Sequence, residues 1–173
     1  MKTDAEGFMY PVVSIELCIE CGACERVCHQ KRTDERFNEA KHVLAYSNKD
    51  EIRQKSTSGG FFTKLSDYIL QLNGTVYGAC YDGAFLVKHK RATSEKERDL
   101  QRYSKYVQSD IQHIFELIIE DLLSQKYVLF TGNPCQVAAV LTFLERKNIC
   151  ADKLITCDFI CHGVSSPLIW REY

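Results

Sequence analysis

Residues 127–136 read YVLFTGNPCQ, and this stretch decides the fold class. Its first five residues are an apolar run of the length and composition that favours a buried strand. Asn133 then fits a helix N-cap, and Pro134 fits the first helical position. A second apolar run over 154–160 predicts another strand. Strand, helix and strand over 127–160 predict one βαβ unit, whose strands should be parallel with a right-handed crossover.

Apolar residues between 57 and 123 predict four further elements of the same region. These are helices over 61–72 and 111–123 and strands over 75–81 and 84–90. Asn73-Gly74 provides a stop for the first helix, Asp82-Gly83 a turn between the strands, and Ser109 or Asp110 a cap for the second helix. Residues 50–173 are therefore predicted to form an α/β domain with a mixed sheet.

Composition excludes several classes of function. The chain has 173 residues, of which 45% are hydrophobic and 26% charged, as in a soluble globular protein. Its formal net charge of −1 provides no strong field for nucleic acid or an anionic membrane. No apolar run approaches the roughly 18 residues of a spanning helix, and no signal segment opens the chain. We therefore expect a cytoplasmic protein that binds neither nucleic acid nor membrane.

The nine cysteines are unevenly distributed, and four of them lie close together near the start of the chain. These four are Cys18, Cys21, Cys24 and Cys28. Their C-x2-C-x2-C-x3-C spacing is that of bacterial-type ferredoxins, and Gly22 would let the backbone approach the inorganic sulfides. Residues 1–35 show little hydrophobic periodicity. We predict that they form a small ferredoxin-type module around a 4Fe–4S cluster, which precedes a partial α/β domain, so that the fold class combines α+β and α/β.

Two questions about this cysteine run stay open in the sequence. Zinc is an alternative metal, although zinc sites more often use two separated pairs of ligands. In two-cluster ferredoxins the fourth cysteine binds the other cluster, and this chain has no second run. Either Cys28 completes the same cluster, or a distant cysteine does.

Two other segments have the composition of ligand-binding loops. Residues 56–60, STSGG, open the helix predicted over 61–72 and would present backbone amides to an anion, although an ordinary helix cap explains them as well. Cys135 falls at a predicted helix N-terminus, where the dipole lowers a thiol's pKa. Cys161 follows the next predicted strand, so both thiols should emerge at the carboxyl edge of the sheet, where open α/β sheets bind ligands. The alternative is two buried structural cysteines.

The basic stretch 88–105 has a simpler interpretation. Its lysines and arginines alternate with acidic residues, which is typical of a solvated helix face and loop rather than a phosphate site.

Six segments occur in the same order as in a known family. They are GFMYP at 7–11, the cysteine run at 18–28, STSGGFFT at 56–63, SKYVQS at 104–109, GNPCQ at 132–136 and DFICHGVSS at 158–166. In these segments the chain resembles the beta-subunit family of coenzyme F420 hydrogenase/dehydrogenase, whose members are iron–sulfur flavoproteins. It departs from the family pattern at Asn133, where Thr is usual, and at His29 and Ser165, where Pro is usual.

The resemblance implies an electron-transfer oxidoreductase. In such a protein, FAD takes a hydride from reduced deazaflavin F420 or another two-electron donor and passes single electrons to a 4Fe–4S cluster. Carried over by position, the flavin contacts would be Ser58, Gly59, Gly60, Thr63, Asn133, Cys135 and Gln136. The implied partners are a small-molecule hydride donor and a redox protein or further C-terminal domain.

Family members run well beyond position 173, so we expect this chain to hold FAD weakly and to need its partner for turnover. Two other functions are compatible with the residues: a flavin-free, ferredoxin-like electron carrier and a zinc-binding, non-catalytic fragment.

Overall fold

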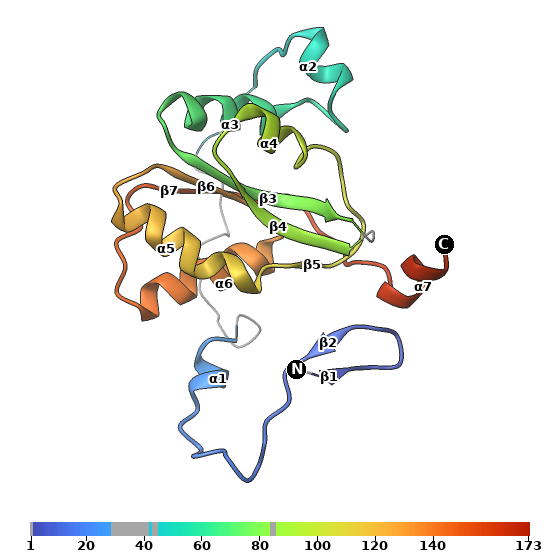
Figure 1. Cartoon of the computed structure of the whole chain (residues 1–173), viewed down its shortest axis with the longest axis vertical. Helices are drawn as coiled ribbons and strands as arrows, with labels where there is room; N and C mark the ends of the chain where they lie inside the picture. Colours follow the sequence, from blue (N-terminus) through green and yellow to red (C-terminus); the bar gives the residue numbers. More distant parts are fainter. Residues whose placement is uncertain (1, 29–41, 43–44, 84–85) are drawn as a thin grey trace.

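The computed structural model describes residues 2–28, 42, 45–83 and 86–173. A five-stranded sheet with the order β5-β4-β3-β6-β7 forms its centre (Figure 1). The strands are β3 (Thr75–Asp82), β4 (Leu86–Ala92), β5 (Ser109–Asp110), β6 (Val128–Thr131) and β7 (Leu154–Cys157). Strands β3, β6 and β7 are mutually parallel, and β4 is antiparallel to β3. The predicted mixed sheet of an α/β domain is therefore confirmed.

The predicted βαβ unit consists of β6, helix α6 (Pro134–Arg146) and β7. Its strands pair in parallel, from Val128 opposite Leu154 to Thr131 opposite Cys157. Strand β7 ends at Cys157, so the predicted extension to residue 160 is wrong. Residues 158–160 are exposed instead, and they begin the loop that leads away from the carboxyl edge.

Helices cover both faces of the sheet (Figure 1). Helices α3 (Phe61–Gln71) and α4 (Glu95–Asp99) lie on one face, where Ile69 packs with Val76 and Leu129. Helices α5 (Phe115–Leu123) and α6 lie on the other, where Tyr77 and Phe130 belong to the larger apolar core. Side chains that alternate along β3 and β6 thus serve two cores, as expected for a sheet covered on both sides.

A buried carboxylate links the strands to α5. Asp121 is fully buried, and Tyr77 donates a hydrogen bond from its hydroxyl to Asp121 Oδ2 at 2.7 Å. Lys126 donates to Asp121 Oδ1 at 3.2 Å, and Arg91 donates to the same oxygen. Burial alone would raise the pKa of Asp121, but the hydrogen bonds from these three partners hold it below its ordinary value.

The turn between α3 and β3 forms the predicted helix stop. Asn73 has a positive φ of 55°, and the Gly74 amide donates to the Ile69 carbonyl at 2.9 Å. This is the αL C-terminal pattern of helices. A Cβ on Gly74 would lie 2.5 Å from the Tyr127 carbonyl oxygen and 2.8 Å from that of Ile69. Both are backbone atoms, so they cannot rotate out of the way.

Gly74→Ala is therefore expected to lower the free energy of unfolding by about 1–3 kcal/mol. Urea titration followed by far-UV circular dichroism would measure the loss. Gly83→Ala is the matched control, because its added Cβ meets no atom within 4 Å. Equal stability of the two variants would contradict the expectation.

The remaining elements lie outside the sheet and its helices. They are strands β1 (Lys2–Thr3) and β2 (Met9–Tyr10), which pair antiparallel, and helices α1 (Ala23–Arg26), α2 (Asp50–Gln54) and α7 (Pro167–Glu172). Figure 1 shows α2 above α3 and the segment carrying α1 below α5 and α6. Helix α1 has no buried residue. His29 and the predicted module boundary at residue 35 lie outside the described residues.

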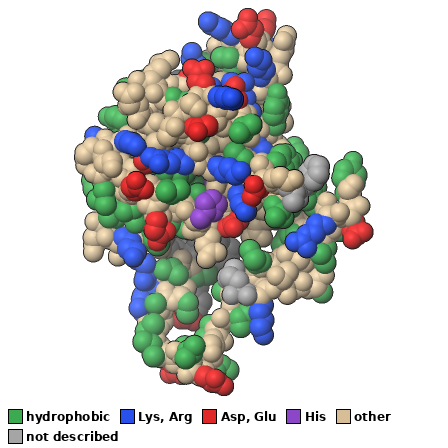
Figure 2. All heavy atoms as spheres, in the orientation of Figure 1, with side chains coloured by type: hydrophobic (Ala, Val, Ile, Leu, Met, Phe, Trp, Pro, Cys, Tyr) green, Lys and Arg blue, Asp and Glu red, His purple; other side chains and the backbone are tan. Residues whose placement is uncertain are grey.

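None of the helices that the structure describes is long and apolar enough to cross a membrane. Over the face shown in Figure 2, basic and acidic side chains are interspersed. The interpretation of residues 88–105 as a solvated face is wrong at Arg98, which is only 1% exposed. Its guanidinium pairs with Asp67 at 2.6 Å and donates to the Thr63 carbonyl at 3.0 Å, so it joins α4 to α3.

Candidate functional site

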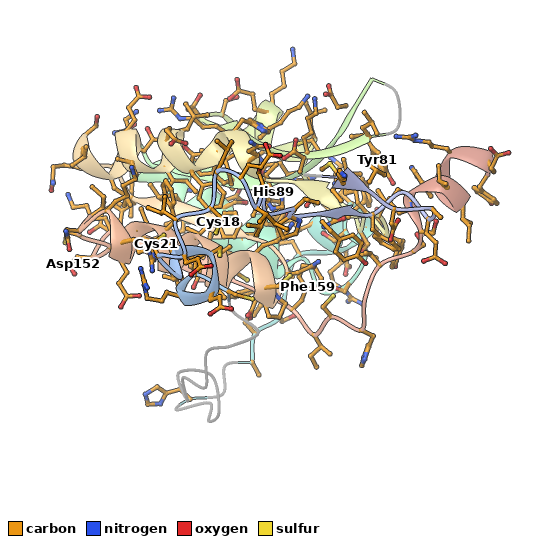
Figure 3. All side chains as sticks on the ribbon, turned by 90° about the horizontal axis from the view of Figure 1, so that it is seen from below. Cys18, Cys21, Tyr81, His89, Asp152 and Phe159 are labelled. Carbon is orange, nitrogen blue, oxygen red and sulfur yellow. The ribbon has the colours of Figure 1, made fainter. Side chains whose placement is uncertain are left out.

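The cysteine run lies on a surface loop. Cys18, Cys21 and Cys24 are exposed, Cys28 is half-buried, and all four are free thiols. Gly22 has a φ of 64°, which lets the chain turn sharply into α1 directly after Cys21. Figure 3, seen from below, shows Cys18 and Cys21 in front of the sheet and its helices, which agrees with the position of this segment beneath α5 and α6 in Figure 1.

These thiols do not converge. Among the described residues, no group of three or more His, Cys, Asp or Glu side chains is arranged to hold a metal ion. The ferredoxin-type module therefore stays a prediction. The donor set itself, four accessible thiols on a loop without a core, suits an iron–sulfur cluster. Cluster binding would have to close this loop, as is common where a metal site forms only with its metal.

A second candidate region is the carboxyl edge of β3, β6 and β7. Residues 104–109, here called the edge segment, contact three other loops there. The hydrogen bonds are Ser104 N to Thr57 Oγ1 at 3.1 Å, Gln136 Nε2 to Ser109 Oγ at 2.8 Å, and Ser165 Oγ to the Tyr106 carbonyl at 2.9 Å. The edge segment thus joins the loop before α3, the start of α6 and the loop after β7.

The flavin contacts predicted before α3 differ in accessibility. Ser58 and Gly59 are exposed, whereas Gly60 and Thr63 are buried. Gly60 has a φ of 79°, and a Cβ there would lie 2.6 Å from Asn48 Nδ2. Ser58 and Gly59 can therefore meet a ligand, while Gly60 and Thr63 shape the loop behind them.

The residues predicted as flavin contacts at the start of α6 also differ in accessibility. Gln136 is buried, with Oε1 accepting from the Asn133 amide at 3.0 Å and Nε2 donating to Ser109, so both of its polar ends are engaged. Asn133 is the helix N-cap, as predicted. Cys135 and Cys161 both lie at this edge and are exposed. Gln136 and Asn133 therefore hold the loop, and Cys135 is the predicted residue here that a ligand can reach.

The expectation of an acidic thiol at Cys135 is wrong. Partial desolvation raises the pKa of Cys135, and the nearby Cys161 thiol raises it further. Both effects outweigh the backbone hydrogen bonds at the helix N-terminus, which lower it. The thiol is therefore predominantly protonated near neutral pH.

Lys105, in the edge segment, has a specific structural position that sequence reasoning did not assign. Its ammonium donates to the Gln101 carbonyl at 3.0 Å, to that of Leu100 at 3.5 Å and to that of Arg102, just beyond the end of α4. Burial lowers the pKa of Lys105 to about 8. A cation on the last carbonyls of a helix is a common cap, so Lys105 anchors the edge segment to α4.

Two buried acceptor atoms near this edge have no hydrogen-bond partner among the described residues. They are Gln101 Oε1 and His89 Nδ1. A Cβ on Gly78 would lie 2.7 Å from Gln101 Oε1 and 3.1 Å from Thr131 Oγ1, so these two side chains pack directly against the Gly78 backbone and fill the space that a side chain would take. No sequence pattern predicts these buried positions, because the residues that surround Gln101 and His89 are far apart in the sequence.

Helix α7 connects the N-terminal hairpin to the end of β3. The Glu6 carbonyl accepts from Ser166 Oγ at 2.6 Å and from the Leu168 amide at 3.3 Å. On its other side, Trp170 stacks on Tyr81 with ring centroids 6.4 Å apart. The hairpin that leads into the cysteine loop is thereby tied to the sheet.

Gly7→Ala should release this contact. Gly7 has a φ of 89°, and a Cβ would lie 3.1 Å from the Leu168 amide nitrogen. We expect amides over 166–172 to exchange with solvent at least several-fold faster in the variant, as hydrogen-exchange mass spectrometry would measure. Gly59→Ala, whose Cβ meets no atom within 4 Å, is the control. Unchanged protection in Gly7→Ala would contradict the role of this contact.

Comparison with known proteins supports the fold. No protein-family model and no curated protein matches the sequence. One solved structure that matches is a chain of the xenon-derivatised F420-reducing [NiFe] hydrogenase complex from Methanosarcina barkeri, with 24% identity over 73% of this chain and a TM-score of 0.59. The match spans 45% of that hydrogenase chain. At this level of identity, the likeness is one of fold.

Proposed function

We propose that this chain is an electron-transfer module of an oxidoreductase, in which Cys18, Cys21, Cys24 and Cys28 hold a 4Fe–4S cluster and the carboxyl edge of the sheet binds FAD. The observation that carries the proposal is the ferredoxin-spaced set of four free thiols on an accessible loop. The mixed α/β fold supports it, because a solved chain of similar fold belongs to an F420-reducing hydrogenase complex.

Several features of the cysteine loop suit a cluster. The left-handed conformation at Gly22 gives a tight turn between the second and third thiols. Arg26 Nη1 donates to the Cys21 carbonyl at 2.7 Å and so brings a positive charge next to the loop. That charge would offset part of the negative charge of a thiolate-bound cluster.

The carboxyl edge has features that suit a flavin. Ser58 and Gly59 are accessible beside the N-terminus of α3, and Cys135 is accessible beside that of α6. A flavin exchanges hydrides as well as single electrons, which would connect a two-electron donor such as reduced deazaflavin to the cluster.

A protein partner is part of the proposal. The apolar side chains Ile15, Leu17 and Ile19, which surround Cys18, are more than 80% exposed. Such a concentration of exposed apolar residues is typical of an interaction site. The solved chain of similar fold comes from a multi-subunit complex.

The second candidate is a flavin-free electron carrier. Three of the seven residues predicted as flavin contacts are not accessible to a ligand, which favours this candidate. Gln136 is engaged in internal hydrogen bonds, and Gly60 and Thr63 are buried. Both candidates require the same cluster.

Anaerobic purification followed by iron, sulfide, zinc and flavin analysis tests these functions. We expect about four iron and four sulfide per chain, and a broad absorption band near ~400 nm. Bound or titratable FAD would support the flavoprotein, and a cluster without FAD affinity would support the carrier. Stoichiometric zinc without iron or sulfide would refute both.

A further inference from the structure

Two exposed cysteines outside the cysteine run lie at the carboxyl edge of the sheet. Cys135 is near the start of α6, and Cys161 lies in the loop after β7. Both are free thiols. Two accessible thiols that lie side by side can share a disulfide, which a single thiol cannot do within one chain.

The pairing of the strands brings the two cysteines to the same corner of the sheet. Strands β6 and β7 are parallel, and their last residues, Thr131 and Cys157, are paired. The Gly132 amide donates to the Cys157 carbonyl at 3.2 Å, so the two chains still run side by side one residue beyond β6. Neighbouring strands are about 4.8 Å apart. Each exposed cysteine lies four residues beyond one of the paired residues, so Cys135 and Cys161 emerge next to each other.

The edge segment contacts the chain on both sides of this corner. Gln136, which directly follows Cys135, donates to Ser109 Oγ at 2.8 Å. Ser165 donates from Oγ to the Tyr106 carbonyl at 2.9 Å. The chain between Tyr106 and Ser109 spans at most about 10 Å even when it is extended. The start of α6 and the loop after β7 are therefore held against the same short segment.

The ionisation of Cys135 agrees with this placement. Partial desolvation is the main reason that its pKa is raised, and the second is the Cys161 thiol, because two thiolates would repel each other. Such repulsion weakens as the separation grows. The two sulfur atoms are therefore close enough to interact.

Cys157 is a poorer partner for Cys135. It is half-buried and packs against the apolar core that contains Ile69 and Leu129, on the face of the sheet that α3 covers. Helix α6, which carries Cys135, lies on the opposite face (Figure 1). Thiol–disulfide exchange needs access to the sulfur, which the exposed Cys161 provides and Cys157 does not.

We infer that Cys135 and Cys161 form a reversible disulfide that ties the start of α6 to the loop after β7. Such a bond would make the carboxyl edge sensitive to the redox state of its surroundings. It would also occupy Cys135, the residue there that a ligand can reach, and so oppose flavin binding. That effect on the flavin rests on the proposed function, whereas the bond itself does not.

The oxidant is a low-molecular-weight disulfide such as oxidised glutathione. One protein thiol loses its proton and attacks a sulfur of the small disulfide, which breaks its S–S bond, releases one small thiolate and leaves a mixed disulfide. The second protein thiol then loses its proton, attacks the protein sulfur of the mixed disulfide and releases the other small thiolate. The two released thiolates take up the two protons. Two protein thiols are thus oxidised, and one small disulfide is reduced to two thiols.

Peptide mapping of the full chain tests for the bond. The chain is incubated with oxidised glutathione, its remaining thiols are alkylated, and it is digested with trypsin. Cleavage at Lys and Arg places Cys135 alone in residues 127–146, and Cys161 together with Cys157 in residues 154–171. The cysteine run falls in other peptides, so its own oxidation does not interfere.

We expect residues 127–146 and 154–171 to be recovered as a linked pair. At about 0.1 mM oxidised glutathione, the linked pair should exceed the mixed disulfide of Cys135 about tenfold, because a neighbouring thiol acts at an effective concentration in the millimolar range. Cys161→Ser should stop at the mixed disulfide on Cys135. Cys157→Ser is the matched control, since it removes the other cysteine of the same peptide and should leave the link unchanged. Circular dichroism checks that each variant is folded.

Two results of the mapping would overturn the inference. One is the absence of linked peptides under conditions that convert the exposed Cys150 to its mixed disulfide. The other is a link that Cys157→Ser abolishes and Cys161→Ser retains. Iron is measured on the same samples, and less iron in Cys135→Ser than in the wild type would make Cys135 a cluster ligand and overturn the inference as well.

Flavin titration separates the disulfide from the proposed function. We expect the oxidised protein to bind FAD at least about tenfold more weakly than the reduced protein. Equal FAD affinity of the two forms would overturn the opposition between the bond and the flavin. Linked peptides in a protein that binds no FAD in either form would retain the disulfide and refute the flavin site.

Discussion

Cys21→Ser is expected to remove nearly all iron and sulfide from the protein while leaving the α/β domain folded. A serine hydroxyl is a harder and much weaker ligand than a thiolate for the iron of such clusters, so the loss of one of the four thiols should leave the cluster incomplete. The fold should survive because α1 has no buried residue and the two apolar cores are formed by residues from 62 onward. Iron and sulfide analysis with absorption near ~400 nm measures the first effect, and far-UV circular dichroism the second.

Cys150→Ser is the matched control, because Cys150 is also an exposed free thiol but lies between α6 and β7, away from the cysteine loop. Its iron content should equal that of the wild type. A full cluster in Cys21→Ser would refute the assignment. Cys28→Ser addresses the fourth ligand, since a retained cluster there would mean that a distant cysteine completes the site.

The central part of the fold could be predicted from local sequence. The strand-helix-strand pattern over 127–160 is found as β6, α6 and β7, and the helix predicted over 61–72 is found as Phe61–Gln71. These elements have strong apolar periodicity and residues such as Pro134 and Asn73-Gly74 at their ends, so local chemistry determines them.

Features that depend on distant partners were missed. Arg98 looks like a surface residue in its acidic and basic surroundings, yet Asp67 and the Thr63 carbonyl compensate its burial from another helix. Strand β5 is formed by Ser109 and Asp110, one of which the sequence predicts as a helix cap. Asp110 does accept from the Gln112 amide at 2.8 Å, and it also pairs with β4. Such contacts become visible only after the chain is folded.

The candidate site was predictable in its location but not in its chemistry. Parallel strands bring Cys135 and Cys161 to one edge, as expected. The pKa of Cys135 depends on desolvation and on its neighbour Cys161, which no position in a motif reveals. Gln136 is similar, because its role in holding Ser109 depends on the edge segment, 27 residues earlier in the chain.

Acid should destabilise this protein through His89, which lies at the centre of the view in Figure 3. His89 is 1% exposed, stacks on Phe130 and donates from Nε2 to the Thr131 carbonyl at 2.8 Å. A carbonyl can only accept, so Nε2 carries the proton of a neutral ring. Burial lowers the pKa of His89 from 6.5 to about 4.

The direction in which stability changes with pH follows from the difference between the pKa of His89 in the folded chain and in the unfolded chain. The unfolded chain binds a proton at His89 below pH 6.5, and the folded chain does so only near pH 4, so the stability that is present above pH 6.5 is lost as the pH falls towards 4. Across that window the loss is about 3 kcal/mol. The buried Asp121 does not contribute there, because its lowered pKa affects stability only below the ordinary range of aspartate.

Urea titrations at pH 7, 5.5 and 4.2 would measure the loss. His89→Gln can keep a hydrogen bond from its amide to the Thr131 carbonyl but cannot titrate, so its stability should change by about 1 kcal/mol or less over the same range. His42→Gln, at an exposed histidine outside the sheet and its helices, should behave as the wild type. Any bound cluster is common to all three proteins, so the difference between them isolates His89. If His89→Gln lost as much stability in acid as the wild type, another buried group would have to be responsible.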